Sequence, residues 1–218
     1  MRSSTLARRV GLPMAAALVG VAAVSCDGGS GATPRAAASR VAVEHGYEAA
    51  YDAGWSTGRR LFADGGKGAA VREVVWGGCA RRSLTAQPQS VVERDRGAWV
   101  MGCKHAVGTG AERRPPAGPV TRRRPDPDLL ARFRSWAAEI GAEQSARRAA
   151  EAVLVHLGDR DYDVELTTGY TDRSAKTDVK RLADTFATWW DGDDGDNATA
   201  WNLILVARDG KRLTTRSL

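Results

Sequence analysis

Apolar residues recur every three or four positions in three stretches of the C-terminal part of the chain, which is the spacing of a helix with one buried face. The first stretch follows Asp126-Pro127, a capping residue and a first-turn proline, and it ends at Gly141. The second runs from about residue 143 to residue 157, and the third from about residue 179 to residue 190. The pattern predicts three amphipathic helices.

Two other stretches have the pattern of β-strands. Residues 162–168 alternate apolar and polar side chains, and residues 201–207 are apolar enough for a central strand. Asp209-Gly210 then predicts a hairpin turn that leads to a last strand near residues 212–216. The order ααβαββ predicts an α+β fold with helices packed on a small three-stranded sheet. A helical crossover can make the first strand parallel to one strand of the hairpin.

The preceding part of the chain, over residues 40–107, predicts a small helical domain. Gly54 and Gly58 lie inside the first helix at some cost to its stability, and we expect them to allow another helix to approach closely. Three helical stretches make up this domain: residues 40–62, residues 69–84, and a third that starts at the capping box of residues 90–93.

Cys79 and Cys103 lie on the inward faces of the second and third of these helices. An even pair of cysteines in an exported chain is more often oxidised than free. Their bond would close a loop of about 25 residues and stabilise the fold by about 3 kcal/mol in the chain-entropy model. We therefore predict a helical hairpin clamped by one disulfide.

Proline and arginine dominate residues 108–126. Proline is unfavourable inside helices and in central strands alike. The sequence therefore predicts a linker here, between the helical domain and an α/β domain over residues 127–218.

The first 25 residues have the pattern of a secretory signal peptide. Arg2, Arg8 and Arg9 precede an uncharged apolar run over residues 10–24, and the small residue Ser25 follows. The run is shorter than the roughly 20 residues that a spanning helix needs. The pattern leaves open whether export uses the general secretory or the twin-arginine route.

Ala23-Val24-Ser25-Cys26 resembles the lipobox of bacterial lipoproteins, with Ala23 where that family usually has leucine. The resemblance implies that Cys26 is diacylated and becomes the first mature residue. It also implies attachment to the extracytoplasmic face of the cell membrane. Residues 26–39 have the small and polar composition of a flexible tether. The alternatives are an ordinary cleaved signal with an unrelated cysteine, and an uncleaved anchor.

Composition and charge narrow the class of partner. The whole chain carries a net charge of +6, but the part after the signal has 29 basic against 26 acidic residues. We therefore expect no nucleic-acid partner for an exported chain. The arginines of the predicted linker have two interpretations. They could contact anionic lipids or wall polymers, or the linker could simply be solvated. High alanine, arginine and glycine with little lysine is typical of an actinomycete-like genome.

The sequence predicts no catalytic, cofactor-binding or metal-binding residue. The acidic run Asp191–Asp196 lacks the ligand spacing of a calcium loop. Asp159, Asp161 and Asp163 have alternate spacing, but Val164 stands where that loop needs glycine. His156 lacks a matched nucleophile. No HExxH or P-loop pattern appears. We therefore favour a lipoprotein that binds an envelope protein, a wall polymer or a small ligand. The alternative is an envelope hydrolase whose site is assembled from scattered polar residues.

Replacing Cys26 by serine should release the protein from the membrane fraction, because no acyl chain would hold it there. Cell fractionation and immunoblotting measure the distribution, with Cys79→Ser as the control that stays membrane-bound. An unchanged distribution of the Cys26→Ser variant would contradict lipidation.

Overall fold

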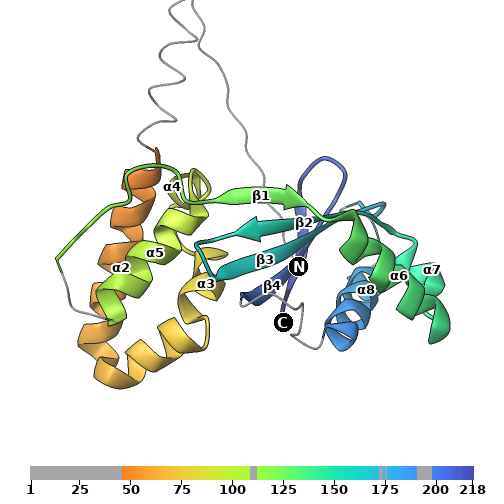
Figure 1. Cartoon of the computed structure of the whole chain (residues 1–218), viewed down its shortest axis with the longest axis horizontal. Coiled ribbons are helices and arrows are strands. Elements are labelled where there is room, and N and C mark those ends of the chain that lie inside the picture. Colours follow the sequence, from red (N-terminus) through yellow and green to blue (C-terminus); the bar gives the residue numbers. More distant parts are fainter. Residues whose placement is uncertain (1–45, 109–111, 172–173, 175, 191–197) are drawn as a thin grey trace, which may run out of the picture. The chain divides into compact units, whose positions relative to one another are not determined.

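The computed structural model describes residues 46–108, 112–171, 174, 176–190 and 198–218, which Figure 1 shows in colour. The predicted signal peptide, the tether and Cys26 lie outside these residues, as does the acidic run Asp191–Asp196. All described residues belong to one compact unit, Pro34–Leu218. None of the helices in this part of the chain is long and apolar enough to cross a membrane.

The first part of the described chain is helical, as predicted. Gly66 has a φ of 53° and bends the longest helix near its end. Asp95 begins the last helix, because its carboxylate accepts a hydrogen bond of 3.0 Å from the Ala98 N–H. The elements are α2 (Gly46–Ala70), the π-helical turn η1 (Val71–Val75), α3 (Gly78–Ser83), α4 (Gln89–Val92) and α5 (Arg96–Gly108).

Helices α2 and α5 touch backbone to backbone. A Cβ atom on Gly54 would lie 1.9 Å from the carbonyl oxygen of Trp99, and one on Gly102 would lie 2.2 Å from that of Tyr51. The corresponding atom on Gly58 would also be too close, at 2.4 Å from a carbonyl oxygen of α5. No side chain fits at these separations, so the predicted role of glycine in helix packing is confirmed.

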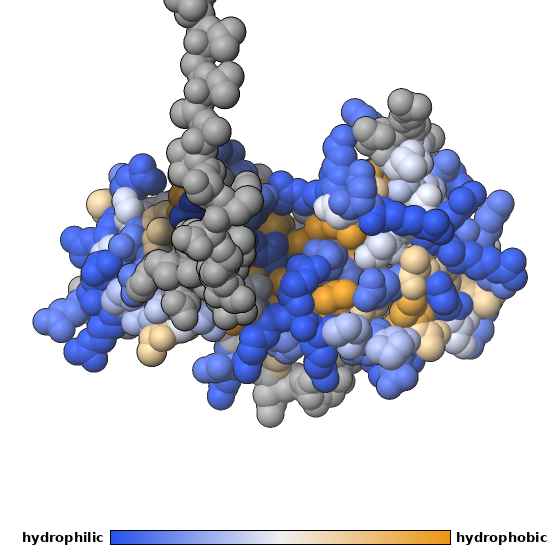
Figure 2. All heavy atoms as spheres, turned by 90° about the horizontal axis from the view of Figure 1, so that it is seen from above, coloured by the Kyte–Doolittle hydropathy of each residue, from blue (hydrophilic) through white to orange (hydrophobic). Residues whose placement is uncertain are grey.

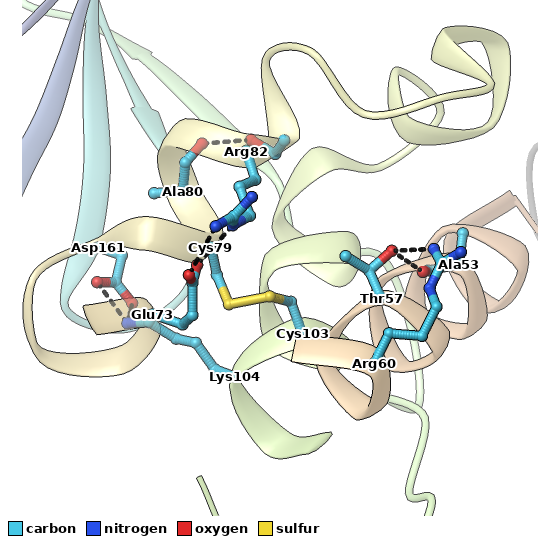
Figure 3. The surroundings of a disulfide bond; sticks show 11 residues. Ala53, Thr57, Arg60, Glu73, Cys79, Ala80, Arg82, Cys103, Lys104 and Asp161 are labelled. Carbon is cyan, nitrogen blue, oxygen red and sulfur yellow. Dashed lines mark hydrogen bonds and ion pairs between the residues drawn. A yellow bond between two sulfur atoms is a disulfide. The ribbon is translucent and has the colours of Figure 1, made fainter. Parts of the chain in front are cut away.

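The Cys79–Cys103 disulfide joins α3 to α5, as the sequence predicts, and its Cα atoms are 5.9 Å apart (Figure 3). Both cysteines are fully buried. Beside the bond, the buried Glu73 accepts two hydrogen bonds from Arg82, of 2.9 and 3.0 Å. The disulfide therefore fixes α3 to α5, and the ion pair fixes η1 to α3.

The second part of the chain forms a mixed sheet with three helices. The strand order is β1-β2-β3-β4-β5, and all neighbouring pairs are antiparallel except β3 and β4. Helix α8 makes the crossover between these two parallel strands, as expected from the sequence. The elements are β1 (Arg122–Pro125), α6 (Pro127–Glu139), α7 (Glu143–Ala146), β2 (Ala149–His156), β3 (Asp161–Thr168), α8 (Lys176–Trp189), β4 (Thr199–Val206) and β5 (Arg212–Ser217).

The mixed α and β composition is confirmed, but the prediction of a three-stranded sheet is wrong, because the sheet has five strands. Strand β2 lies within residues 143–157, where the sequence pattern predicts a helix. Its Ala152 and Leu154 belong to one hydrophobic cluster, whereas Val153 and Val155 belong to another. A strand buried on both faces is apolar at nearly every position, so its two-residue period does not show in the sequence.

Strand β1 comes from the proline- and arginine-rich stretch that predicts a linker. It is an edge strand, so only one side of it needs hydrogen bonds, and Pro125 stands at its end. Just before β1, the Asp95 carboxylate accepts hydrogen bonds from the backbone N–H groups of Val120 and Thr121, of 2.6 and 2.9 Å. The stretch is therefore tied to both the helices and the sheet, and the predicted domain boundary falls within one compact unit.

Helices pack against both faces of the sheet (Figure 1). On one face, Phe133 of α6 and Phe186 of α8 lie 4.9 Å apart between ring centroids, in the cluster with the inward residues of β3 and β4. On the other face, Trp99 and Cys103 of α5 cluster with Val155 of β2 and its neighbours. Viewed from above, hydrophilic side chains surround a smaller apolar area (Figure 2).

Gly54→Ala and Gly102→Ala should each lower the free energy of unfolding by about 1–3 kcal/mol or more, because α2 and α5 must move apart to admit a methyl group. Urea unfolding measures the change. The control is Gly68→Ala, where the nearest atom to a new Cβ is 3.7 Å away, and it should be neutral or stabilising by up to about 1 kcal/mol. Equal losses at all three positions would contradict the backbone contact.

Candidate functional site

Strand β3 places three acidic side chains on the face of the sheet that α5 covers. Asp161, Asp163 and Glu165 alternate along the strand, so they project from the same face. Each of them pairs with a cation. Asp161 pairs with Lys104 of α5, and Asp163 pairs with Arg96 of the same helix. Glu165 pairs with Arg123 of β1. We refer to these six residues as the polar junction.

Asp163 lies at the centre of the polar junction and is fully buried. Its Oδ2 atom accepts a hydrogen bond of 2.5 Å from Arg96 Nη2, and its Oδ1 atom accepts one of 2.8 Å from Asn202 Nδ2. Burial raises the pKa of this carboxyl group to about 6, although the neighbouring guanidinium acts in the opposite direction. Burial also lowers the pKa of Arg96. Each group therefore depends on the other to stay ionised inside the protein.

Asp161 is also fully engaged. Its two carboxylate oxygens accept hydrogen bonds of 2.8 and 2.7 Å from Lys104 Nζ. Trp201 Nε1 donates a third, of 2.6 Å, and the lysine ammonium lies 5.9 Å from the centroid of that tryptophan ring. The lysine thus combines an ion pair with a cation–π contact.

The polar junction has the chemistry of a structural contact. Its carboxylates face lysine and arginine side chains that are already paired with them, an arrangement that fixes α5 on the sheet. Across the residues that the structure covers, no group of three or more histidine, cysteine, aspartate or glutamate side chains could hold a metal ion.

A different kind of site lies between α8 and β5, where a groove encloses a cavity of about 350 Å³. Its apolar lining comes from Val179 and Ala183 of α8 and from Leu213 of β5. Hydroxyl groups of Thr214 and Thr215 add hydrogen-bonding capacity. We refer to this feature as the α8–β5 groove.

Cations outnumber anions along the α8–β5 groove. Lys176, Lys180 and Arg216 line it together with the single carboxylate of Asp184. Lys180 pairs with that carboxylate, and Arg216 Nε lies 3.6 Å from its Oδ1 atom. The hydrogen bond from Lys180 lowers the pKa of Asp184, so the carboxylate stays ionised at neutral pH. The groove therefore presents an apolar lining with a positively charged margin.

The residues that sequence reasoning considered for chemistry lie elsewhere. His156 packs near Tyr162, with ring centroids 5.9 Å apart, and His105 Nδ1 lies 3.1 Å from the hydroxyl oxygen of Tyr51. Neither histidine lines the α8–β5 groove. Sequence reasoning missed the groove because its two walls are separated by the whole of β4. The available signal was that Lys176 and Lys180 lie close in sequence to apolar residues of the same helix.

No protein-family model matches the chain, and no curated protein or solved structure matches it either. The observations that bear on function are therefore the geometry of the described residues and the sequence pattern at the N-terminus.

Asp163→Asn should remove part of the pH dependence of stability. The pKa of Asp163 is raised to about 6 in the folded state, above the value of about 4 expected in an unfolded chain, so the folded state holds the proton more tightly. This group's contribution to stability should therefore be fully present below about pH 4 and be lost as pH rises through about 6, by up to about 3 kcal/mol.

Urea unfolding of wild type and variant at several pH values between 4 and 7.5 checks this expectation. The difference in unfolding free energy, wild type minus Asp163→Asn, should fall as pH rises through that range. A difference that is constant, or that rises with pH, would contradict the raised pKa.

Proposed function

We propose that this chain is a lipid-anchored extracytoplasmic protein that binds an extended, acidic segment of another envelope protein. The segment lies in the α8–β5 groove. The observation that carries the proposal is an apolar groove directly beside an exposed edge strand with a cationic margin.

Strand β5 is suited to pair with another chain. Within the described sheet it has one neighbour, β4, and most of its side chains are exposed. The backbone N–H and C=O groups on the free side of an edge strand can accept an additional strand. The ligand class that fits this edge is an extended polypeptide.

The groove supplies the side-chain contacts that such a segment needs. Its cavity of about 350 Å³ lies in the size range of protein ligand sites. Alternate residues of an added strand would point to the same side. Apolar residues of the segment would contact Val179, Ala183 and Leu213.

The charges along the groove select for an acidic segment. Lys176 and Arg216 flank the apolar lining, and Lys180 already shares Asp184 with the arginine. Acidic side chains on the bound segment would therefore meet an excess of positive charge, which favours both encounter and register.

The sequence pattern at the start of the chain supports the proposed location. The signal-like run and the lipobox-like residues ending at Cys26 support export and attachment to the membrane. A protein held in this way meets its partners in the envelope, and a groove for an extended segment matches a binding role there.

The alternative function, an envelope hydrolase, has no specific observation in its favour. The groove presents hydroxyl groups from Ser174, Thr214 and Thr215, but none of its lining residues is a histidine that could act as their base.

Combining Lys176→Glu with Arg216→Glu should weaken binding of a ten-residue peptide of alternating valine and glutamate by roughly tenfold or more, because two attractions become repulsions. Fluorescence anisotropy of the labelled peptide at low salt measures the dissociation constant.

The matched control combines Arg132→Glu with Arg147→Glu, two exposed positions outside the groove that change the net charge equally. This control should bind within about twofold of the wild type. Equal weakening in both double variants, or no binding by the wild type at millimolar peptide, would contradict the groove as the site.

A further inference from the structure

Exposed apolar side chains are concentrated in one short segment. Four of the five large apolar residues that are exposed in the described part of the chain lie between Phe62 and Trp76. Three of them follow one another along η1 and its end: Val71, Val75 and Trp76 are 44%, 62% and 59% exposed. We refer to these three residues as the apolar tip (Figure 1, gold, lower left). Such a cluster marks an interaction surface when it is held in place.

Neighbouring contacts hold the apolar tip in its outward position. Gly77, with a φ of 68°, turns the chain inward, and its Cα packs so closely on Trp201 that a Cβ would lie 2.1 Å from the indole ring. The carbonyl oxygen of Trp76 accepts a hydrogen bond from Arg81. The Glu73–Arg82 pair fixes the middle of η1. Trp76 therefore stays exposed because Glu73 before it and Gly77 after it are held in place.

Cations outnumber anions in the part of the sequence around the apolar tip. Residues 59–82 contain six basic and two acidic residues. One of the two acids, Glu73, is buried and paired with Arg82, so it contributes little negative charge to the surface. The basic residues are Arg59, Arg60, Lys67, Arg72, Arg81 and Arg82.

We infer that the apolar tip inserts into the head-group region of an anionic lipid bilayer. Tryptophan favours the membrane interface, and lysine and arginine near it are attracted to anionic lipids. A second copy of the chain is a poorer partner, because it would bring the same excess of positive charge to the contact. This inference rests on the proposed lipid anchor, which would keep the tip near the membrane.

The distance from the anchor agrees with this contact. About 20 residues separate Cys26 from the start of α2, and a stretch of that length can reach no farther than about 70 Å. A folded body on such a tether stays close enough to the bilayer for a surface patch to touch it.

The test uses the mature chain with Cys26→Ser, so that no acyl chain contributes to binding. This protein should co-sediment with vesicles containing 30% phosphatidylglycerol and much less with pure phosphatidylcholine. Val75→Ser with Trp76→Ser should lower the partition coefficient roughly tenfold. Arg72→Glu should lower it as well and should flatten its dependence on salt.

The matched control is Ile140→Ser, an exposed apolar residue on α6 with 54% exposure, which should bind as before. Circular dichroism checks that every variant is folded. The inference is overturned if Ile140→Ser loses as much binding as the tip variant, or if the tip variant binds unchanged. It is also overturned if neutral vesicles bind equally, or if ultracentrifugation shows a dimer that the tip variant loses. Because the anchor is absent here, finding no acyl group on Cys26 by mass spectrometry of the cellular protein would refute the lipid anchor without touching this result.

Discussion

The packing of α5 on the acidic face of β3 is the interaction on which the rest of the structure depends. At its centre the fully buried Asp163 pairs with the largely buried Arg96, so each supplies the opposite charge that the other needs inside the protein. Helix α5 also contacts the neighbouring helices α2 and α3. Glycines bring α2 into backbone contact with it, and the Cys79–Cys103 disulfide attaches α3. The helical segment reaches the sheet through α5, and also through Gly77 and Leu84, which pack on residues of β4.

This arrangement determines which parts of the sheet can meet a ligand. Helices α2 to α5 pack against one face and α6 to α8 against the other. Strand β1, at one edge, is short and is preceded by residues that Asp95 ties to α5. Strand β5, at the other edge beside the α8–β5 groove, has β4 as its one neighbour among the described strands. The apolar tip belongs to a different element, so the proposed protein partner and the proposed lipid surface would not compete for the same residues.

The sequence predicts the elements that bury one face and misses those whose form depends on distant partners. Helices α6 and α8 have clear patterns because Phe133 and Phe186 point to a single core. Strand β2 lacks such a pattern because both of its faces are buried, and β1 forms in a segment whose composition disfavours strands because β2 supplies its hydrogen bonds. The disulfide was predictable from two cysteines on inward faces. The polar junction was not, because Arg96 and Asp163 are 67 positions apart and no local pattern relates them.

Backbone hydrogen exchange of β5 tests the central claim most directly, which is that a bound segment extends the sheet at this edge. The amides of Arg212–Ser217 that face away from β4 should exchange rapidly in the free protein. They should slow markedly when the alternating valine–glutamate peptide is bound, while the amides of β1 at the opposite edge stay unchanged. Unchanged exchange in β5 at saturating peptide, or equal slowing in β1, would contradict the account.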